Sequence, residues 1–220
     1  MNRGCEFFVE KFPESFKARK IESCVISSLE VDFRGGRSIS DGVKAGFLGE
    51  KVIFLETRLA DVYEQAALVK AVRKIGCEKF FLIGGGSPGS DEGDNDVFFI
   101  DDQVNLSGQN PLIGIRLSDT EERFPDMSDL YDRDFNTCFG NFLSKRGMKV
   151  DRGILLVPRK LDVLTDVEKK AIKFFEKVVL SKDIFAYALA ARHAKASLIA
   201  GMVVKPVCLL GILKIFESYA

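Results

Sequence analysis

The stretch Leu106–Arg133, which reads LSGQNPLIGIRLSDTEERFPDMSDLYDR, is the part of the sequence that decides the fold. Gly108 and Asn110 are residue types that mark turns. Phe124 should be extended because Pro125 follows it. We therefore predict a long loop instead of a helix or strand. Loops of this length inside a compact domain are uncommon and usually have a function.

Two motifs inside this stretch, SGQNPLIG from Ser107 and RFPDMSDLYDR from Arg123, resemble the trimeric branch of the purine nucleoside phosphorylase family. There the region reads SGQNPLxG followed by RFPxMSDxYD, so the double motif is a specific signal. The resemblance implies phosphorolysis of purine nucleosides to base and ribose 1-phosphate, as in purine salvage. It also implies a homotrimer in which Phe124 reaches into the active site of a neighbouring subunit.

Length and composition favour one domain, residues 1–220, with a sizeable core, because 46% of the residues are hydrophobic. Lys plus Arg and Asp plus Glu number 32 each, so no net charge favours nucleic acid or an anionic membrane as a partner. The apolar run Val207–Phe216 is too short to span a bilayer. The N-terminus lacks the apolar core of a signal peptide. Five scattered cysteines without metal spacing predict no metal site and reduced thiols in the cytoplasm.

Alternating strand and helix patterns predict a three-layer α/β domain. The resemblance makes this the nucleoside-phosphorylase fold, a central mixed β-sheet flanked by helices, with the domain shortened at both ends relative to the family. The expected strands are Ser23–Val31, Lys51–Glu56, Lys79–Ile83, Asn95–Val104, Gly153–Val157 and Val178–Ser181. The expected helices are Val62–Ile75, Met127–Lys145 with Ser128 as N-cap, Asp166–Phe175 with Thr165 as N-cap, Phe185–Ala194 and Val207–Ser218.

The resemblance assigns phosphate binding to Ser28, Arg58, the backbone of Gly84, and Asp183. Phosphate would be the co-substrate, and no cofactor is implied. Asp183 replaces a serine of the family, and a carboxylate at this position repels phosphate. We therefore predict that Arg58 pairs with Asp183 and that the pair fills the anion site from within.

The ribose and base positions carry further replacements. Leu164 stands where the family has the glutamate that binds the purine, and Val204-Lys205-Pro206 replaces Thr-Asn-Lys, so that Pro206 removes the second purine anchor. The single histidine, His193, is interpreted as structural. The positions that the resemblance assigns to the ribose and base pocket are Gly85, Gly86, Phe124, Leu155, Val163, Leu180 and Lys182.

Three functions remain open. The chain is a phosphorylase of the resembled kind, a non-catalytic relative (a pseudoenzyme) that binds a purine nucleoside, another small molecule or an oligomer partner, or a glycosyl-transferring enzyme with an altered substrate. In the third case Arg58, Arg159, Lys160 and Lys182 would attract an anionic ligand, and Asp162 or Glu168 would replace the lost glutamate. We favour a homologue with weak or no catalysis, because both purine anchors are apolar.

Overall fold

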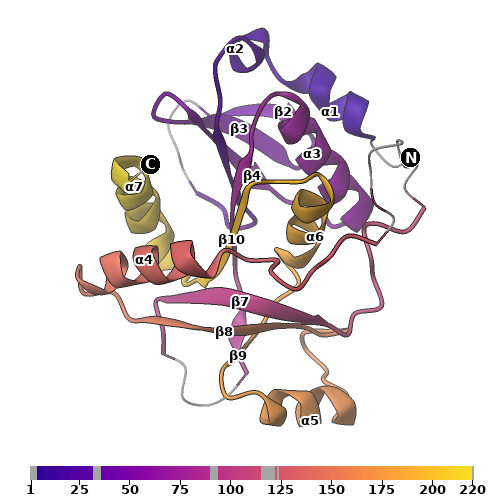
Figure 1. Cartoon of the computed structure of the whole chain (residues 1–220), viewed down its shortest axis with the longest axis vertical. Helices are drawn as coiled ribbons and strands as arrows, with labels where there is room; N and C mark the ends of the chain where they lie inside the picture. The colour runs from indigo at the N-terminus through magenta and orange to yellow at the C-terminus, as the bar shows by residue number, and fades with distance from the viewer. Residues whose placement is uncertain (1–3, 32–35, 90–93, 115–121, 123, 220) are drawn as a thin grey trace.

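The computed structural model describes residues 4–31, 36–89, 94–114, 122 and 124–219 (Figure 1). In these residues the strands are β1 Ser23–Ser27, β2 Arg37–Ser40, β3 Val43–Leu48, β4 Val52–Thr57, β5 Lys79–Gly84, β6 Ser87–Pro88, β7 Val97–Asn105, β8 Val150–Val157, β9 Val178–Leu180 and β10 Leu198–Val204. The helices are α1 Cys5–Lys11, α2 Glu14–Lys17, α3 Val62–Lys74, α4 Arg133–Ser144, α5 Asp166–Phe174, α6 Phe185–His193 and α7 Leu209–Tyr219, with the 3₁₀ helix η1 Pro206–Cys208.

The strands form one mixed sheet in the order β2-β3-β4-β1-β5-β10-β7-β8-β9-β6. Its centre, β4, β1, β5 and β10, is parallel. Every residue of β1 and β4 is buried, which explains why these strands read as continuous apolar runs. β10 pairs with β7 in the antiparallel sense, and β7, β8 and β9 then run parallel to one another.

The second half of the sheet curls back on itself. Only Gly85 and Gly86 separate β5 from β6, yet β6 pairs with β9 at the far end of the strand order. The strands from β5 to β9 therefore form an incomplete barrel that closes on the glycine run, Gly84–Gly86. A Cβ atom on Gly86 would lie 2.7 Å from the carbonyl oxygen of Leu180, so a side chain there would collide with the backbone of β9.

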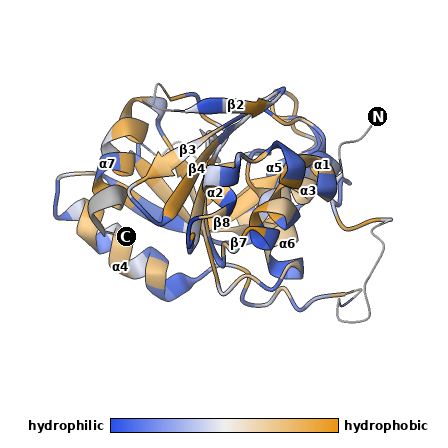
Figure 2. Ribbon diagram, turned by 90° about the horizontal axis from the view of Figure 1, so that it is seen from above, coloured by the Kyte–Doolittle hydropathy of each residue, from blue (hydrophilic) through white to orange (hydrophobic). Residues whose placement is uncertain are grey.

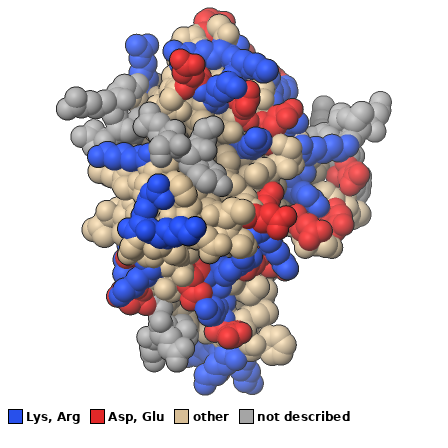
Figure 3. Space-filling model, turned by 60° about the vertical axis from the view of Figure 1, so that its left-hand side comes forward, with Lys and Arg blue, Asp and Glu red and all other residues tan. Residues whose placement is uncertain are grey.

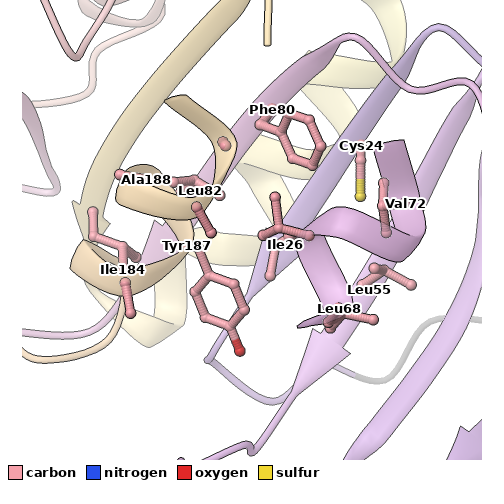
Figure 4. Close-up of a cluster of buried hydrophobic side chains, with 14 of the residues drawn as sticks. Cys24, Ile26, Leu55, Leu68, Val72, Phe80, Leu82, Ile184, Tyr187 and Ala188 are labelled. Atoms are coloured by element: carbon pink, nitrogen blue, oxygen red, sulfur yellow. The ribbon is translucent and has the colours of Figure 1, made fainter. Parts of the chain in front are cut away.

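Helices cover both faces of the sheet. One apolar cluster joins the sheet to α1, α3 and α6, and a second joins it to α4 and α7 (Figure 1). Figure 2 shows hydrophobic strands in the middle of the molecule between helices that carry hydrophilic residues. Figure 4 shows part of the first cluster, with Ile26, Leu68 and Tyr187 drawn from β1, α3 and α6. The expected α/β fold, a central mixed sheet flanked by helices, is confirmed.

Two expectations about the elements need correction. α4 begins at Arg133, capped by an Asp132 carboxylate oxygen that accepts the N–H of Phe135 at 2.7 Å, so Ser128 is not its N-cap. Ser128 instead donates its N–H (2.9 Å) and hydroxyl (2.7 Å) to the Asp126 carboxylate, which closes a turn. The central strand β10 and the β2–β3 hairpin were absent from the expected elements. Thr165 does cap α5, as predicted.

The surface carries charges of both signs. Figure 3 shows basic and acidic side chains interspersed on the face that it displays, in keeping with the formal net charge of +0. None of the helices in the described residues is long and apolar enough to cross a membrane. The same residues contain no group of His, Cys, Asp and Glu side chains arranged to hold a metal ion.

Candidate functional site

A cavity of about 370 Å³ lies where β1 and β4 end and α6 begins. The carboxyl ends of parallel strands meet at one edge of a sheet, where ligands of α/β proteins commonly bind. The cavity brings together four residues that the sequence assigned to the site: Ser28, Arg58, Lys182 and Asp183. We call it the Asp183 cavity. Its other lining residues are Thr57, Leu59, Ala60, Val62, Gln65, Gln109, Phe185 and Tyr187.

The Asp183 carboxylate is bonded to the glycine run. Its Oδ2 accepts the Ser28 hydroxyl at 2.6 Å and the Gly85 backbone N–H at 2.9 Å. Ser181 Oγ accepts the N–H of Asp183 at 3.1 Å and donates to the Gly85 carbonyl at 2.6 Å. Gly84 permits this approach, since a Cβ there would lie 2.8 Å from the Asp183 Cβ. A hydroxyl and a backbone N–H are donors suited to an oxyanion, and here both bind a carboxylate of the chain itself.

Arg58 does not pair with Asp183, and that prediction is wrong. Its Nη2 lies 2.6 Å from Glu30 Oε2 and 3.8 Å from Glu56 Oε1. Glu56 is only 2% exposed and also pairs with Lys44 at 3.2 Å. These two carboxylates hold the guanidinium on the β4 side of the cavity. Asp183 therefore obtains its hydrogen bonds from neutral donors.

The floor of the cavity is neutral. The hydroxyls of Tyr187 and Thr57 are 2.7 Å apart and buried, and Figure 4 shows the Tyr187 hydroxyl pointing away from the apolar cluster around its ring. Burial raises the pKa of Tyr187 well above its ordinary value, so this hydroxyl stays protonated. Gln65 Nε2 donates to the Leu59 carbonyl at 2.6 Å, whereas Gln65 Oε1 has no hydrogen-bond partner among the described residues.

Sequence reasoning missed these floor residues, although some signals were present. Thr57 adjoins Arg58, and Gln109 lies inside the SGQNPL motif. Tyr187 belongs to the helix predicted after Asp183. Gln65 gives no such signal, because it reads as one more polar residue on α3.

Other assigned positions lie outside the Asp183 cavity. Gly85, Gly86 and Pro206 line a larger cavity of about 650 Å³, the barrel cavity, which shares no lining residue with the Asp183 cavity. Leu164 packs instead against a separate cluster that includes Leu156 and Leu180, so the two positions that the resemblance assigns to purine anchors have different surroundings. Two of the remaining positions are buried: Leu155 is fully buried and Leu180 is 6% exposed. The other two are on the surface: Val163 is 63% exposed and Phe124 is 87% exposed.

The exposure of Phe124 shows whether its side chain packs onto its own chain. With 87% of its surface accessible, its side chain does not fold back onto the core of its own chain. An apolar ring of this size gains by being covered. Gln109, from the same stretch of sequence, lines the Asp183 cavity, so the loop reaches the site at one point and projects from the molecule at another.

Glu168 and Lys182, two charged residues of the altered-substrate hypothesis, already have hydrogen-bond partners within the chain. Glu168 accepts the Arg159 N–H at 2.7 Å and the Thr165 N–H at 2.6 Å, within the capping box of α5. These hydrogen bonds lower the pKa of Glu168. Lys182 Nζ donates to the Arg159 carbonyl at 3.3 Å. Glu168 is therefore not available as a replacement for the lost glutamate, which removes one expectation of the altered-substrate hypothesis.

Lys205 and Pro206 also offer no amide to a ligand. Lys205 Nζ lies 2.6 Å from Asp94 Oδ1 and 3.6 Å from Asp96 Oδ1, and Pro206 has no side-chain donor or acceptor. Chemically, the site therefore consists of a carboxylate that is hydrogen-bonded within the chain, a neutral hydroxyl floor and a second cavity with a mixed apolar and charged lining.

No protein-family model matches the chain. Two proteins named purine nucleoside phosphorylase 1 are similar to it in sequence. The one from Bacillus subtilis (strain 168) is 24% identical over 127 residues, 57% of this chain and 47% of that protein. The one from Geobacillus stearothermophilus is 26% identical over 129 residues, 57% and 46% of the respective chains. The matched region thus spans about half the length of these curated relatives.

Solved structures show the same fold along almost the whole chain. Schistosoma mansoni purine nucleoside phosphorylase in complex with adenosine superposes with a TM-score of 0.75 at 14% identity, covering 98% of this chain and 94% of that one. A Schistosoma purine nucleoside phosphorylase in complex with guanosine gives a TM-score of 0.78 at 16% identity, covering 99% and 96%. The chain is therefore similar in sequence to purine nucleoside phosphorylases over 57% of its length and shares their fold along almost all of it.

Proposed function

We propose that this protein is a purine nucleoside phosphorylase homologue with weak or no phosphorolysis, because the Asp183 carboxylate takes hydrogen bonds from donors that the resemblance assigns to phosphate binding. The observation that carries the proposal is the pair of hydrogen bonds from Ser28 Oγ (2.6 Å) and Gly85 N–H (2.9 Å) to the Asp183 carboxylate. In the related enzymes we expect such donors to hold the co-substrate. Here they stabilise a residue of the protein.

The negative charge of Asp183 also opposes phosphate binding. A second anion about 4 Å from Asp183 would be repelled by about 4 kcal/mol per pair of unit charges at an effective permittivity near 20. Arg58, the nearest guanidinium in the lining, is paired with Glu30 at 2.6 Å. Phosphate would therefore have to displace Asp183 and also compete for Arg58.

The residues at the positions that the resemblance assigns to the purine base support the same conclusion. Leu164, Lys205 and Pro206 present neither the carboxylate nor the amide that the resemblance would require. Removing one preorganised hydrogen-bonding group from an active site typically slows a reaction about 100- to 1,000-fold. We infer that this chain binds a small molecule without breaking its glycosidic bond.

We further propose that the protein associates with itself, most simply as a homotrimer. Phe124 is 87% exposed in the single chain, and the surrounding RFPDMSDLYDR motif is the best match to the trimeric branch. A second copy that covers this ring would remove an apolar side chain from water. The five free cysteines suit a reducing compartment, so we place the protein in the cytoplasm.

The test is a base-release assay on inosine, guanosine and adenosine, with and without phosphate. We expect no phosphate-dependent release by the wild-type protein. Turnover at an ordinary enzymatic rate, about 1 per second or faster, would contradict the proposal. Release that is equally fast without phosphate would assign hydrolysis instead. Asp134→Ser, which changes an exposed aspartate of α4 outside both cavities, is the control for Asp183→Ser in the same assay.

A further inference from the structure

We propose that one end of the molecule, formed by α5 and the loop before it, docks on the surface of a bilayer that contains anionic lipid. α5 lies at one end of the long axis of the molecule (Figure 1). Residues 160–174, which we call the α5 surface, contribute nothing to the lining of the Asp183 cavity or of the barrel cavity. The α5 surface is therefore independent of the function of either cavity.

Apolar side chains gather on the α5 surface. It contains four of the nine large hydrophobic residues that are exposed in the described part of the chain. They are Leu161, 47% exposed, Val163, 63%, Val167, 69%, and Phe174, 83%. Exposed apolar residues that are scattered singly need no explanation, whereas those that gather in one place mark interaction sites. The α5 surface is thus a candidate for such a site.

Hydrogen bonds and helix geometry hold these side chains near one another. The carboxylate of Glu168 accepts the N–H groups of Arg159 at 2.7 Å and Thr165 at 2.6 Å, so both ends of the loop are fixed to the first turn of α5. Val167 and Phe174 are seven residues apart on this helix, close to two full turns, so they lie on one side of it about 10 Å apart. The apolar loop and the apolar stripe of the helix therefore adjoin.

The charge left on the α5 surface is positive. It contains four lysines and three acidic residues, but Glu168 is buried and Asp166 lies 3.9 Å from Lys169. The charged side chains that make no ion pair with the described residues are Lys160, Lys170, Lys173 and Asp162. Figure 3 shows basic side chains beside uncharged ones at this end of the molecule. An anionic partner therefore meets three lysines and one carboxylate.

Charge and shape together favour a lipid surface over a protein. A twofold contact with a second copy would place the same surface opposite itself, so lysines would face lysines. Protein interfaces in general are depleted of lysine, and their apolar anchors fill pockets of the partner. A bilayer needs no matching shape, because apolar side chains enter the acyl boundary while lysines stay among anionic headgroups. The net charge of +0 for the whole chain conceals this local excess.

Co-sedimentation with vesicles at low ionic strength tests the inference. We expect the wild-type protein to bind vesicles of equal parts phosphatidylcholine and phosphatidylserine far better than vesicles of phosphatidylcholine alone, and added salt should release it. Each lysine near an anionic surface contributes about fivefold to the affinity, so Lys170→Gln and Lys173→Gln together should weaken binding about 25-fold. Lys20→Gln and Lys145→Gln together remove the same charge from exposed residues outside the α5 surface and should weaken binding much less.

The apolar contact is tested by a matched pair of valines. Val167→Ala should weaken binding to the mixed vesicles about threefold to tenfold, because less apolar surface enters the bilayer. Val207→Ala makes the same change at an exposed valine outside the α5 surface and should leave binding as in the wild type. Circular dichroism shows that each variant is folded.

Four results would overturn the inference. They are no binding to the mixed vesicles, equal binding to both kinds of vesicle, an equal loss in the control lysine variant, and an equal loss in Val207→Ala. Binding of soluble polyglutamate that requires Lys170 and Lys173, without binding to vesicles, would assign the α5 surface to an acidic protein instead.

Discussion

The Asp183 cavity and the barrel cavity are linked by the glycine run, since Gly85 lines the barrel cavity and donates its N–H to Asp183, but the two cavities are built differently. In the first, a carboxylate of the chain takes the hydrogen bonds of Ser28 and Gly85. In the second, valines and Phe98 line a space of about 650 Å³ together with charged residues such as Glu176 and Lys177. On the function proposed above, an aspartate in place of the family's serine turns a ligand position into part of the protein. Apolar volume depends on many contacts and persists when single polar groups change.

The glycine run that separates the two cavities gives the largest expected effect. Gly86→Ala would place a Cβ 2.7 Å from the Leu180 carbonyl oxygen, so β9 would have to shift. We expect a loss of about 2–3 kcal/mol in the free energy of unfolding, at the upper end of ordinary overpacking. Denaturant titration measures it. Gly211→Ala is the matched control, because its Cβ would meet Met148 at an ordinary 3.6 Å and alanine favours a helix by roughly 0.5–1 kcal/mol. Equal stability of Gly86→Ala and wild type would show that Gly86 is not tightly packed against the backbone of β9.

Phe124 tests whether another copy completes the Asp183 cavity. Covering a phenylalanine contributes about 1.5–3 kcal/mol, so Phe124→Ala should weaken self-association by roughly 10- to 100-fold per contact. Sedimentation at several protein concentrations measures the assembly, and circular dichroism confirms that the protomer is folded. Phe174→Ala removes a ring that is similarly exposed, 83% against 87%. A monomeric wild-type protein, or a larger effect at Phe174, would refute the proposed interface.

The buried hydroxyl pair of Tyr187 and Thr57 belongs to the Asp183 cavity and has no counterpart in the lining of the barrel cavity. Tyr187→Phe removes one partner of a buried 2.7 Å hydrogen bond and leaves the Thr57 hydroxyl without it. We expect a loss of about 1–3 kcal/mol in unfolding free energy. Tyr63→Phe, on a residue that is 40% exposed, should cost close to nothing. If both substitutions are neutral, the Tyr187–Thr57 pair does not contribute to the floor.

The smallest effect concerns α5, which packs against a cluster that includes Val178, a residue of the barrel-cavity lining. Hydrogen bonds from Thr165 and Arg159 lower the pKa of Glu168. The ionised form therefore stabilises the fold above the ordinary pKa of glutamate, and this contribution disappears as the pH falls through the lowered value in the folded protein. Unfolding free energies measured from neutral to acidic pH should fall less steeply for Glu168→Gln than for wild type. Glu78→Gln should leave the wild-type slope intact, and parallel curves for all three proteins would contradict the assignment.

Much of the fold follows from the sequence for a physical reason. Central parallel strands are buried on both faces, so KVIFLE and KFFLI can be recognised as apolar runs. The start of α4 could not be placed in the same way, because Asp126, Ser128 and Asp132 are all acceptable caps and local geometry selects Asp132. β10 was missed although LIAGMVV is equally apolar.

The proximity of four assigned residues could be predicted from the sequence, but their bonding could not. Ser28, Arg58, Lys182 and Asp183 follow strand ends, and the topology of the sheet brings these ends together. The choice of partner depends on distances that no motif contains. Glu30 lies close enough to take Arg58, which leaves Asp183 to the neutral donors.

Phosphate binding tests the central claim most directly. In calorimetric titrations with inorganic phosphate, the wild-type protein should show no binding at millimolar concentration. Asp183→Ser, which frees Ser28 Oγ and the Gly85 N–H and removes the negative charge, should bind at least about tenfold more tightly. Asp183→Asn, which removes the charge but keeps the volume, should gain less than Asp183→Ser. Micromolar binding by the wild-type protein, with phosphate held by Ser28 and Arg58 in a crystal grown from it, would contradict the account.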